Sequence, residues 1–212
     1  MMQLGILTAT PVQVKRSCLC LSNADLDLTS WCAQGLAGSV GRYVSFMREA
    51  TAGYAQEAAL AAALATAAID ASLCAHAPAR PLDAPVLVHT HFTSLCEHHL
   101  LPFQGQVRVA LCPLPGLAQS ALQRLVLQLI SCYTRRLQVQ ERITHQVADG
   151  LAALAMQGCV LVVCDAVHMC MVARGVEQHA SATLTTAARG LFASDVALRS
   201  RVLEQLLTLQ QV

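Results

Sequence analysis

Apolar residues recur with a helical period in the N-terminal part of the chain. Between residues 35 and 54 they lie three or four positions apart, as on one face of a helix, at Val40, Tyr43, Val44 and Met47. Ser39 precedes this run and is a residue type that caps helix N-termini. Residues 55–75 form a second apolar run that is rich in alanine. The pattern therefore predicts two consecutive helices.

A proline-rich segment separates these helices from a region with a different period. Residues 77–85, APARPLDAP, hold three prolines, and no helix crosses such a segment. In residues 86–95 the side chains alternate and many are β-branched, which predicts a strand. Residues 104–113 predict a second strand, which ends at a proline.

The remaining chain predicts two more helices, two more strands and a closing helix. The helices cover residues 117–136 and 138–156, the strands 158–170 and 181–192, and the closing helix 195–207. The order strand, strand, helix, helix, strand, strand predicts an α+β fold, in which an antiparallel sheet carries two consecutive helices on one face. The N-terminal helices precede it. Open sheet edges of this kind are usually paired, which favours association between subunits.

These elements divide the chain into three parts. Residues 1–34 show no clear period, and we expect an N-terminal extension that is poorly ordered. Residues 35–85 contain the two helices and the proline-rich linker, and residues 86–212 contain the α+β domain. A chain of 212 residues suits one domain of ordinary size with such an appendage.

Charge and hydropathy argue against two classes of protein. Lys plus Arg is 14 and Asp plus Glu is 13, whereas a nucleic-acid binder normally has a basic excess. The mean hydropathy is +0.48, yet neither long apolar run fits a membrane span of roughly 20 residues. Residues 58–69 are too short and end at Asp70, and residues 151–172 contain Asp165 and His168. We expect neither a nucleic-acid partner nor a membrane partner.

The chain has ten cysteines but no recognisable secretion signal. This combination favours cytosolic thiols, some of them metal ligands, over a framework of disulfides. We therefore expect a cytoplasmic protein. An organelle transit peptide is the alternative, because Lys15 and Arg16 precede the first acidic residue, Asp25.

The densest cluster of reactive side chains is SLCEHHLLPF, residues 94–103. A Cys-x-x-His spacing on a turn brings Cys96 and His99 to one side, and zinc prefers thiolate and imidazole ligands. The pair alone supports two interpretations equally. One is a metal site, and the other is a buried cysteine beside surface histidines.

A second cluster, HMCMVARG, begins at His168. His168 and Cys170 lie two residues apart on a predicted strand, so we expect them to face the same way. If Cys170 joins Cys96 and His99, the three ligands leave a fourth position open, as in catalytic zinc sites. Such a zinc lowers the pKa of a bound water. His98 and His168 would then be available to transfer protons.

A third cluster, RRLQVQERIT at residues 135–144, places Gln140 and Glu141 at the start of a predicted helix. One interpretation is a solvated charged face. The other is a carboxylate that accepts two hydrogen bonds from a planar ring with adjacent N–H donors, such as the edge of guanine.

The three segments together resemble the signature segments of the GTP cyclohydrolase I family, in the same order and with similar spacing. The resemblance runs from about Gly35 to Leu207. It implies the tunnelling fold (T-fold), in a toroidal homodecamer with sites between subunits. It also implies a zinc-dependent conversion of GTP to 7,8-dihydroneopterin triphosphate with release of formate, the first step toward folates or tetrahydrobiopterin.

The resemblance assigns roles near the metal to five residues. Cys96, His99 and Cys170 match the zinc ligands of the family. His98 matches a histidine that assists the addition of water to C8 of guanine. His168 matches the acid/base for ring opening and later proton transfers.

The resemblance also assigns contacts with substrate. Glu141 matches the carboxylate that anchors guanine, and Gln140 lies beside it. Arg174 matches an arginine on the triphosphate. Arg42 matches the arginine of the Thr-Pro-x-Arg-Val segment, also a phosphate contact, although this chain lacks the proline. We interpret Glu97 as a structural partner in the wall of the site rather than as a catalyst.

The loop GLAQSALQRL, which starts at Gly116, departs from the family pattern. The family has Gly-Leu-Ser-Lys followed by a helix arginine, and all three polar side chains hold triphosphate. Alignment on Gly116 puts Gln119 at the lysine, and a gapless alignment on RRLQVQER puts Leu125 there. Losing this contact costs about 1.5–3 kcal/mol of binding unless Ser120 and Arg124 compensate.

Three interpretations follow. The first is an active GTP cyclohydrolase I with an altered phosphate pocket. The second is a divergent paralogue that acts on another purine or serves as a non-catalytic oligomer partner. The third is a T-fold protein whose zinc is structural, with His168 as the fourth ligand. We expect the first, because every zinc, proton-transfer and guanine position carries the expected residue type.

Overall fold

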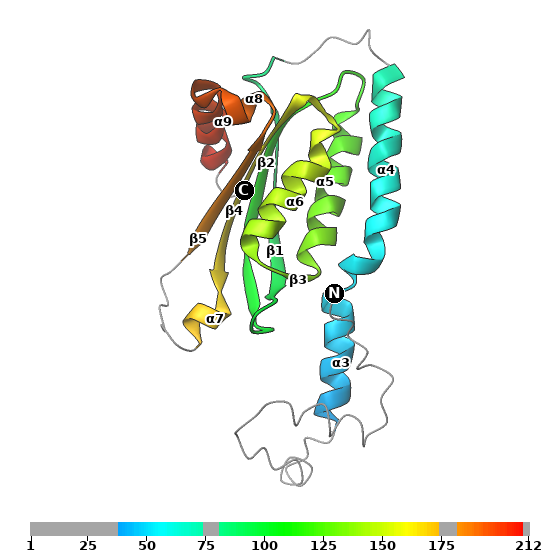
Figure 1. Ribbon diagram of the computed structural model, residues 1–212, viewed down its shortest axis with the longest axis vertical. Coiled ribbons are helices and arrows are strands. Elements are labelled where there is room, and N and C mark those ends of the chain that lie inside the picture. Colours follow the sequence, from blue (N-terminus) through cyan, green and yellow to red (C-terminus); the bar gives the residue numbers. More distant parts are fainter. Residues whose placement is uncertain (1–37, 74–80, 174–181, 210–212) are drawn as a thin grey trace. The chain divides into compact units, whose positions relative to one another are not determined.

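The computed structural model describes residues 38–73, 81–173 and 182–209 (Figure 1). The chain forms two compact units, residues 1–49 and residues 50–212. The predicted extension, residues 1–34, lies outside the described residues.

Helix α3 (Ser39–Ala50) is the described part of the first unit. It begins at Ser39, the residue that the sequence places at a helix start. Arg42 donates a hydrogen bond to the Ser39 hydroxyl at 3.0 Å, and the rings of Tyr43 and Phe46 lie 6.1 Å apart. The phosphate contact predicted for Arg42 remains a prediction.

The second unit is built on a five-stranded sheet in the order β3-β1-β2-β4-β5 (Figure 1). Strands β1 (Val86–Cys96), β2 (Pro102–Pro113), β4 (Ala155–His168) and β5 (Thr183–Arg189) pair antiparallel with their neighbours. Strand β3 (Leu137–Gln138) pairs parallel with the last two residues of β1. The predicted α+β class is confirmed, and β3 makes the sheet mixed.

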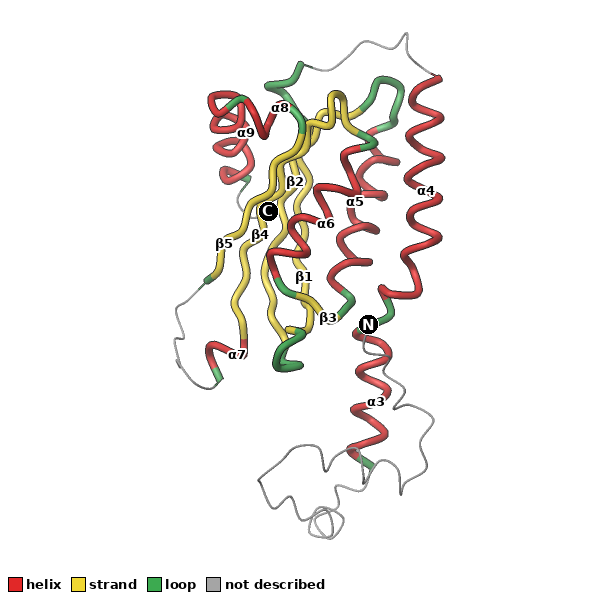
Figure 2. The backbone as a smooth tube through the Cα atoms, viewed as in Figure 1, coloured by secondary structure: helices red, strands yellow, loops and turns green. Residues whose placement is uncertain are grey.

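Helices α5 (Gln119–Thr134) and α6 (Gln140–Ala152) pack on one face of the sheet, and α4 (Gly53–Leu73) packs on α5 (Figure 2). Alternate strand residues such as Val107, Val109 and Leu111 point into this core and are fully buried. On α5 and α6 the buried residues recur at helical spacing, as at Leu122 and Val126. The strands place apolar side chains on one face at every second residue, and the helices do so at every third or fourth residue. Both sets of side chains therefore pack into this one core.

The opposite face carries α8 (Leu191–Ser194) and α9 (Val196–Thr208), which cover one part of the sheet. Gly190 joins β5 to α8 with a φ of 60°, and a Cβ there would lie 2.2 Å from the Gln157 carbonyl oxygen. The close approach therefore requires glycine. Asp195 caps α9 by accepting a hydrogen bond from the Leu198 amide at 2.9 Å.

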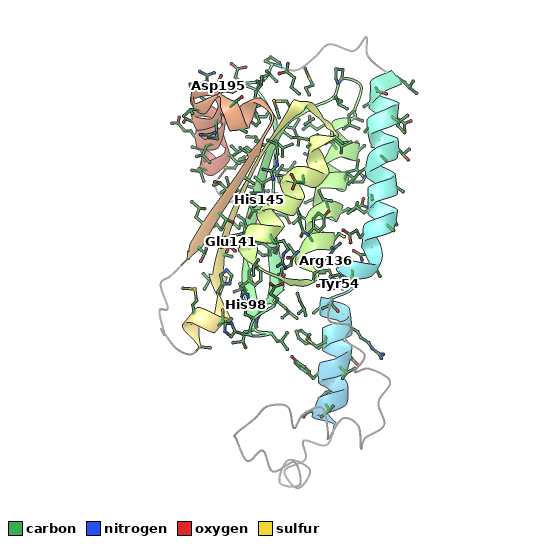
Figure 3. All side chains as sticks on the ribbon, in the orientation of Figure 1. Tyr54, His98, Arg136, Glu141, His145 and Asp195 are labelled. Carbon is green, nitrogen blue, oxygen red and sulfur yellow. The ribbon has the colours of Figure 1, made fainter. Side chains whose placement is uncertain are left out.

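Arg136 ties α4 to the end of α5 (Figure 3). Its side chain is only 6% exposed, donates to the Gly53 carbonyl at 3.2 Å and pairs with Glu57 at 3.2 Å. The guanidinium also lies over the rings of Tyr54 and Tyr133, 5.2 and 4.8 Å from their centroids. These contacts offset the cost of burying a cation. They also fix the chain just before β3.

Several element boundaries differ from the prediction. The predicted helix 138–156 ends at Ala152, and β4 starts at Ala155 instead of residue 158. The predicted strand 181–192 ends at Arg189, because Gly190 turns the chain into α8. None of the described helices has the length and apolar character needed to cross a bilayer.

Candidate functional site

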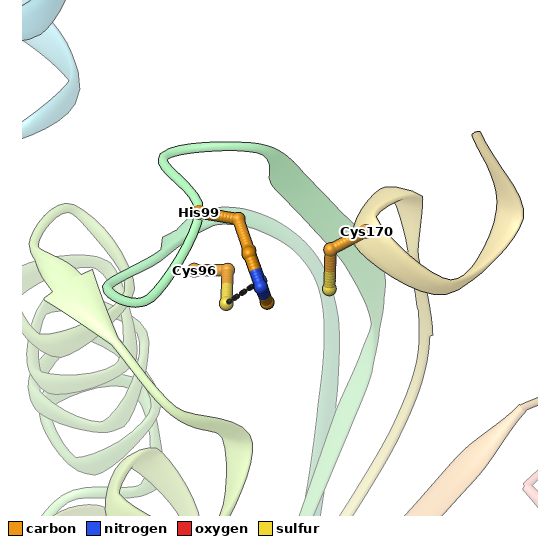
Figure 4. A group of neighbouring side chains, drawn as sticks. All are labelled: Cys96, His99 and Cys170. Carbon is orange, nitrogen blue, oxygen red and sulfur yellow. Dashed lines mark hydrogen bonds between the residues drawn. The ribbon is translucent and has the colours of Figure 1, made fainter. Parts of the chain in front are cut away.

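Cys96, His99 and Cys170 lie together although 74 positions of the chain separate the first from the last (Figure 4). Their ligand atoms all lie within 4.8 Å of one another, and Cys96 Sγ is 3.8 Å from His99 Nδ1. Tetrahedral zinc with usual bond lengths holds a sulfur and a nitrogen about 3.6 Å apart. Among the described residues, this set of two thiols and one imidazole supplies three ligands, which fits a zinc ion with one open position.

The turn between β1 and β2 presents two of these residues. Cys96 is the last residue of β1, its amide donates to the Leu101 carbonyl at 2.9 Å, and its carbonyl accepts from the Leu100 amide at 2.8 Å. Leu100 has a φ of 56°, a conformation that non-glycine residues rarely adopt. This tight turn brings His99 back over Cys96.

The third residue, Cys170, lies on the short helix α7 (Met169–Val172). The prediction that His168 and Cys170 share one face of a strand is therefore wrong. Phe103 is the first residue of β2 that pairs with β4, and its partner is His168. Residues after His168 therefore have no partner on β2. The chain then turns into α7, which directs the Cys170 sulfur toward Cys96 and His99 (Figure 4).

His168 lies at the end of β4, next to this group of ligands. Its ring stacks on Phe103 with centroids 4.5 Å apart, and Nε2 lies 2.8 Å from Gln140 Oε1. Burial lowers the pKa of His168, and the negative charge of Glu141 partly opposes this shift. The surroundings therefore favour the neutral imidazole.

Gln140 determines which nitrogen of that imidazole carries the hydrogen. Its amide nitrogen donates to the carbonyl oxygens of Cys164 and Thr183, at 3.0 and 2.8 Å, and carbonyls can only accept. Gln140 Oε1 must then accept, so the hydrogen is on His168 Nε2 and Nδ1 has the lone pair. Gln140 is 1% exposed and its side-chain hydrogen bonds support a positioning role, while the substrate contact predicted for it remains a prediction.

Glu141 is exposed in the first turn of α6, beside Gln140. The negative charge of Glu141 raises the pKa of His168, so Glu141 lies near the candidate site. His98 is also exposed, and its Nδ1 lies 3.9 Å from Cys96 Sγ. Figure 3 shows Glu141 and His98 toward the same end of the sheet. The guanine and proton-transfer roles predicted for them remain predictions.

Two of the predicted phosphate contacts, Ser120 and Arg124, do not lie at this group within one chain. Ser120 and Arg124 are exposed on the first turns of α5, which begins beyond the end of β2 at Pro113. Because β2 runs antiparallel to β1, this end of the sheet is opposite to Cys96 (Figure 1). Arg174 lies outside the described residues.

Sequence reasoning missed Arg142, which contacts the β1–β2 turn that presents Cys96 and His99. Its guanidinium donates to both Glu97 oxygens, at 2.5 and 2.9 Å, and this hydrogen bonding lowers the pKa of Glu97. The Glu97 amide also donates to the Gln138 carbonyl of β3 at 3.0 Å. Glu97 is thus part of the wall of the site, as interpreted above. No pattern in the sequence connects residues 97 and 142.

Comparison with known proteins agrees with these features. The chain matches the family model described as GTP cyclohydrolase I over residues 21–207. It is 46% identical over 109 residues to a protein named GTP cyclohydrolase 1 of Deinococcus radiodurans, covering 51% of this chain and 49% of that protein. A protein of the same name from Wolinella succinogenes is 42% identical over 117 residues, covering 54% of this chain and 59% of that protein. The chain thus spans about half the length of the curated relatives it matches.

Proposed function

This chain belongs to the GTP cyclohydrolase I family, and we propose on that premise that it opens the guanine ring of GTP by zinc-dependent hydrolysis. The products are 7,8-dihydroneopterin triphosphate and formate. The observation that carries the proposal is the Cys96–His99–Cys170 group, because three ligands from the described residues would leave a fourth position of a zinc ion for water. It lies beside an imidazole whose proton-accepting nitrogen is defined.

Cys96, His99 and Cys170 are the proposed ligands of the zinc. A zinc ion held by them would supply a water molecule with a lowered pKa for the attack on the ring. The donor set supports zinc over magnesium or calcium, because thiolates are ligands that those harder cations avoid.

The proton transfers are assigned to His168 and His98. His168 accepts a proton at Nδ1, because Gln140 keeps the hydrogen on Nε2. Burial keeps this imidazole neutral, which is the form a general base needs. His98 is exposed in the β1–β2 turn, beside the proposed ligands Cys96 and His99, where it can assist the addition of water.

Substrate is held at two ends. Glu141 accepts the N–H donors of guanine with its carboxylate. Arg42, Arg174, Ser120 and Arg124 are the proposed phosphate contacts. Since Ser120 and Arg124 lie at the opposite end of the sheet from Cys96, a neighbouring copy would have to supply them.

That requirement supports a homo-oligomer, proposed as a decamer, with sites between subunits. In the described part of the second unit, β5 has no strand on its outer side and β1 pairs there only through its last two residues. Both edges are therefore available for strands of neighbouring copies. The products would feed folate or tetrahydrobiopterin synthesis.

One feature favours a second candidate function. The loop that starts at Gly116 lacks the lysine of the family pattern. A paralogue that acts on another purine, or that serves as a non-catalytic oligomer partner, would not need this triphosphate contact.

The test is to purify the full chain, measure zinc and follow formate and pterin fluorescence with GTP. We expect about one zinc per chain and turnover, and we expect Cys170→Ser to lose both. Zinc without pterin would refute the cyclohydrolase activity and favour the second candidate. Zinc retained by Cys170→Ser would show that the third ligand is wrong. Thermal stabilisation by GTP and not by ATP would support Glu141 as the guanine contact.

A further inference from the structure

We infer that Arg142 is a positioning residue for the metal centre, because its ion pair with Glu97 holds the turn that presents Cys96 and His99. The inference rests on the proposed function, since it concerns the same zinc. Arg142 reaches 45 positions back along the chain and contacts both carboxylate oxygens of Glu97. Such a two-point contact fixes direction as well as distance.

The turn has a structural reason to need this support. Leu100 adopts a left-handed conformation and is 41% exposed, so the turn is strained and lies at the surface. The hydrogen bonds of Cys96 with Leu100 and Leu101 lie within the turn. Glu97 joins the turn to other elements, through its amide on Gln138 of β3, where Cys96 also pairs, and through its carboxylate on Arg142 of α6.

The position of Arg142 on α6 links this turn to the rest of the site. Arg142 follows Gln140 and Glu141 in the first turn of that helix, and Gln140 holds His168. Arg142 also donates to Gln138 Oε1 at 3.4 Å, on the strand that pairs with Cys96. One helical turn therefore sets the relative placement of the metal ligands and the proposed acid/base.

The pair contributes little to stability but should matter for metal binding. The side chains of Arg142 and Glu97 are 44% and 31% exposed, and ion pairs with this exposure stabilise a fold only weakly. Groups that orient metal ligands, in contrast, commonly change metal affinity by about 10–100-fold.

If Arg142 acts only through its charge or only by positioning the turn, its loss changes the zinc affinity in opposite directions. Loss of the Arg142 guanidinium removes a positive charge and leaves the Glu97 carboxylate near the cation site, so charge alone would raise the affinity for zinc. Loss of positioning lowers that affinity. The direction of the change therefore separates the two roles.

The experiment measures zinc affinity of the full chain by competition with a chromophoric chelator. Arg142→Met should lower the affinity about tenfold or more, and Arg142→Lys, which keeps the charge but not the two-point contact, should also lower it. In a double-mutant cycle, Glu97→Gln should lower the zinc affinity of Arg142→Met little further, because both substitutions remove the same ion pair.

Arg189→Met is the matched control. Arg189 lies on β5 and pairs at 2.6 Å with Asp149, which lies on α6 as Arg142 does. This ion pair joins α6 to β5 and not to the β1–β2 turn. This control should keep wild-type zinc affinity, and the metal-free forms of both methionine variants should unfold at similar temperatures.

The outcomes are distinct. Unchanged or tighter zinc binding by Arg142→Met and Arg142→Lys would overturn the positioning role while leaving the proposed function intact. An equal loss in Arg189→Met would also overturn it, because the effect would then be general. Absence of zinc binding by the wild-type chain would overturn the proposed function, and the inference with it.

Discussion

Replacing Gln140 with leucine tests whether this buried amide prepares His168 for proton transfer. We predict that Gln140→Leu lowers turnover of GTP about 100-fold, because a correctly placed acid/base contributes about 10²–10⁴-fold to rate. The amide accepts from His168 Nε2 at 2.8 Å, and without it neither the tautomer nor the ring orientation is defined. The zinc content should not change, because the hydrogen bonds of the Gln140 side chain go to Cys164, Thr183, Thr185 and His168 rather than to a proposed ligand.

The same substitution has a calculable effect on stability. Leucine nearly fills the volume of glutamine, so lost hydrogen bonds dominate over a cavity. The Cys164 carbonyl, the Thr183 carbonyl and the Thr185 hydroxyl each lose a donor, and His168 loses an acceptor. An unsatisfied buried group costs about 1–3 kcal/mol. Of these residues, only Cys164 is fully buried, since Thr183, Thr185 and His168 are half-buried and Thr185 keeps its hydrogen bond to Thr144, so we expect a total near 2 kcal/mol.

The assay is steady-state pterin fluorescence per zinc-loaded chain, together with urea unfolding at a fixed protein concentration. Gln205→Leu is the matched control, because its amide also donates to a carbonyl, that of Asp83 at 3.1 Å, from α9 on the other face of the sheet. Turnover by Gln140→Leu within about threefold of this control would refute the argument, since a proton-transfer role would demand more. Loss of zinc as well would place Gln140 among the supports of the metal.

Four further predictions concern a buried cation, the loop that starts at Gly116 and two cysteines. Arg136→Met should lower the free energy of unfolding by about 3 kcal/mol, because it removes a buried charge with its hydrogen bonds. Arg201→Met, on the exposed face of α9, is the control and should change this free energy little. Urea unfolding measures both variants. Gln119→Lys should lower the KM for GTP about tenfold if a charge-assisted phosphate contact is restored, and an unchanged KM would argue against the alignment on Gly116. Alkylation followed by mass spectrometry should leave Cys164 unmodified, because burial raises its pKa to about 12. The same measurement should show Cys170 modified only after a chelator removes zinc; modification before chelation would contradict its role as a ligand.

The period of the apolar residues was sufficient to predict the helices and strands that bury one face. The runs around Val107 and Leu122 follow the periods of a strand and a helix because each must direct apolar side chains into one core. The same reasoning could not find β3, since two residues carry no period. It also extended the strand through Cys170, because the end of β4 depends on where β2 begins, which is a fact of pairing and not of local pattern.

The sequence by itself determined the chemistry of the candidate site. Cys96, His99 and Cys170 are named by residue type and motif, since thiolate and imidazole are the ligands that zinc prefers. Tertiary structure decided how the site is held together. Gln140 became a buried support of His168, and Arg142 became the partner of Glu97. Their roles depend on groups that packing brings from distant segments, and a side chain's partner, unlike its chemistry, cannot be read from its neighbours in the chain.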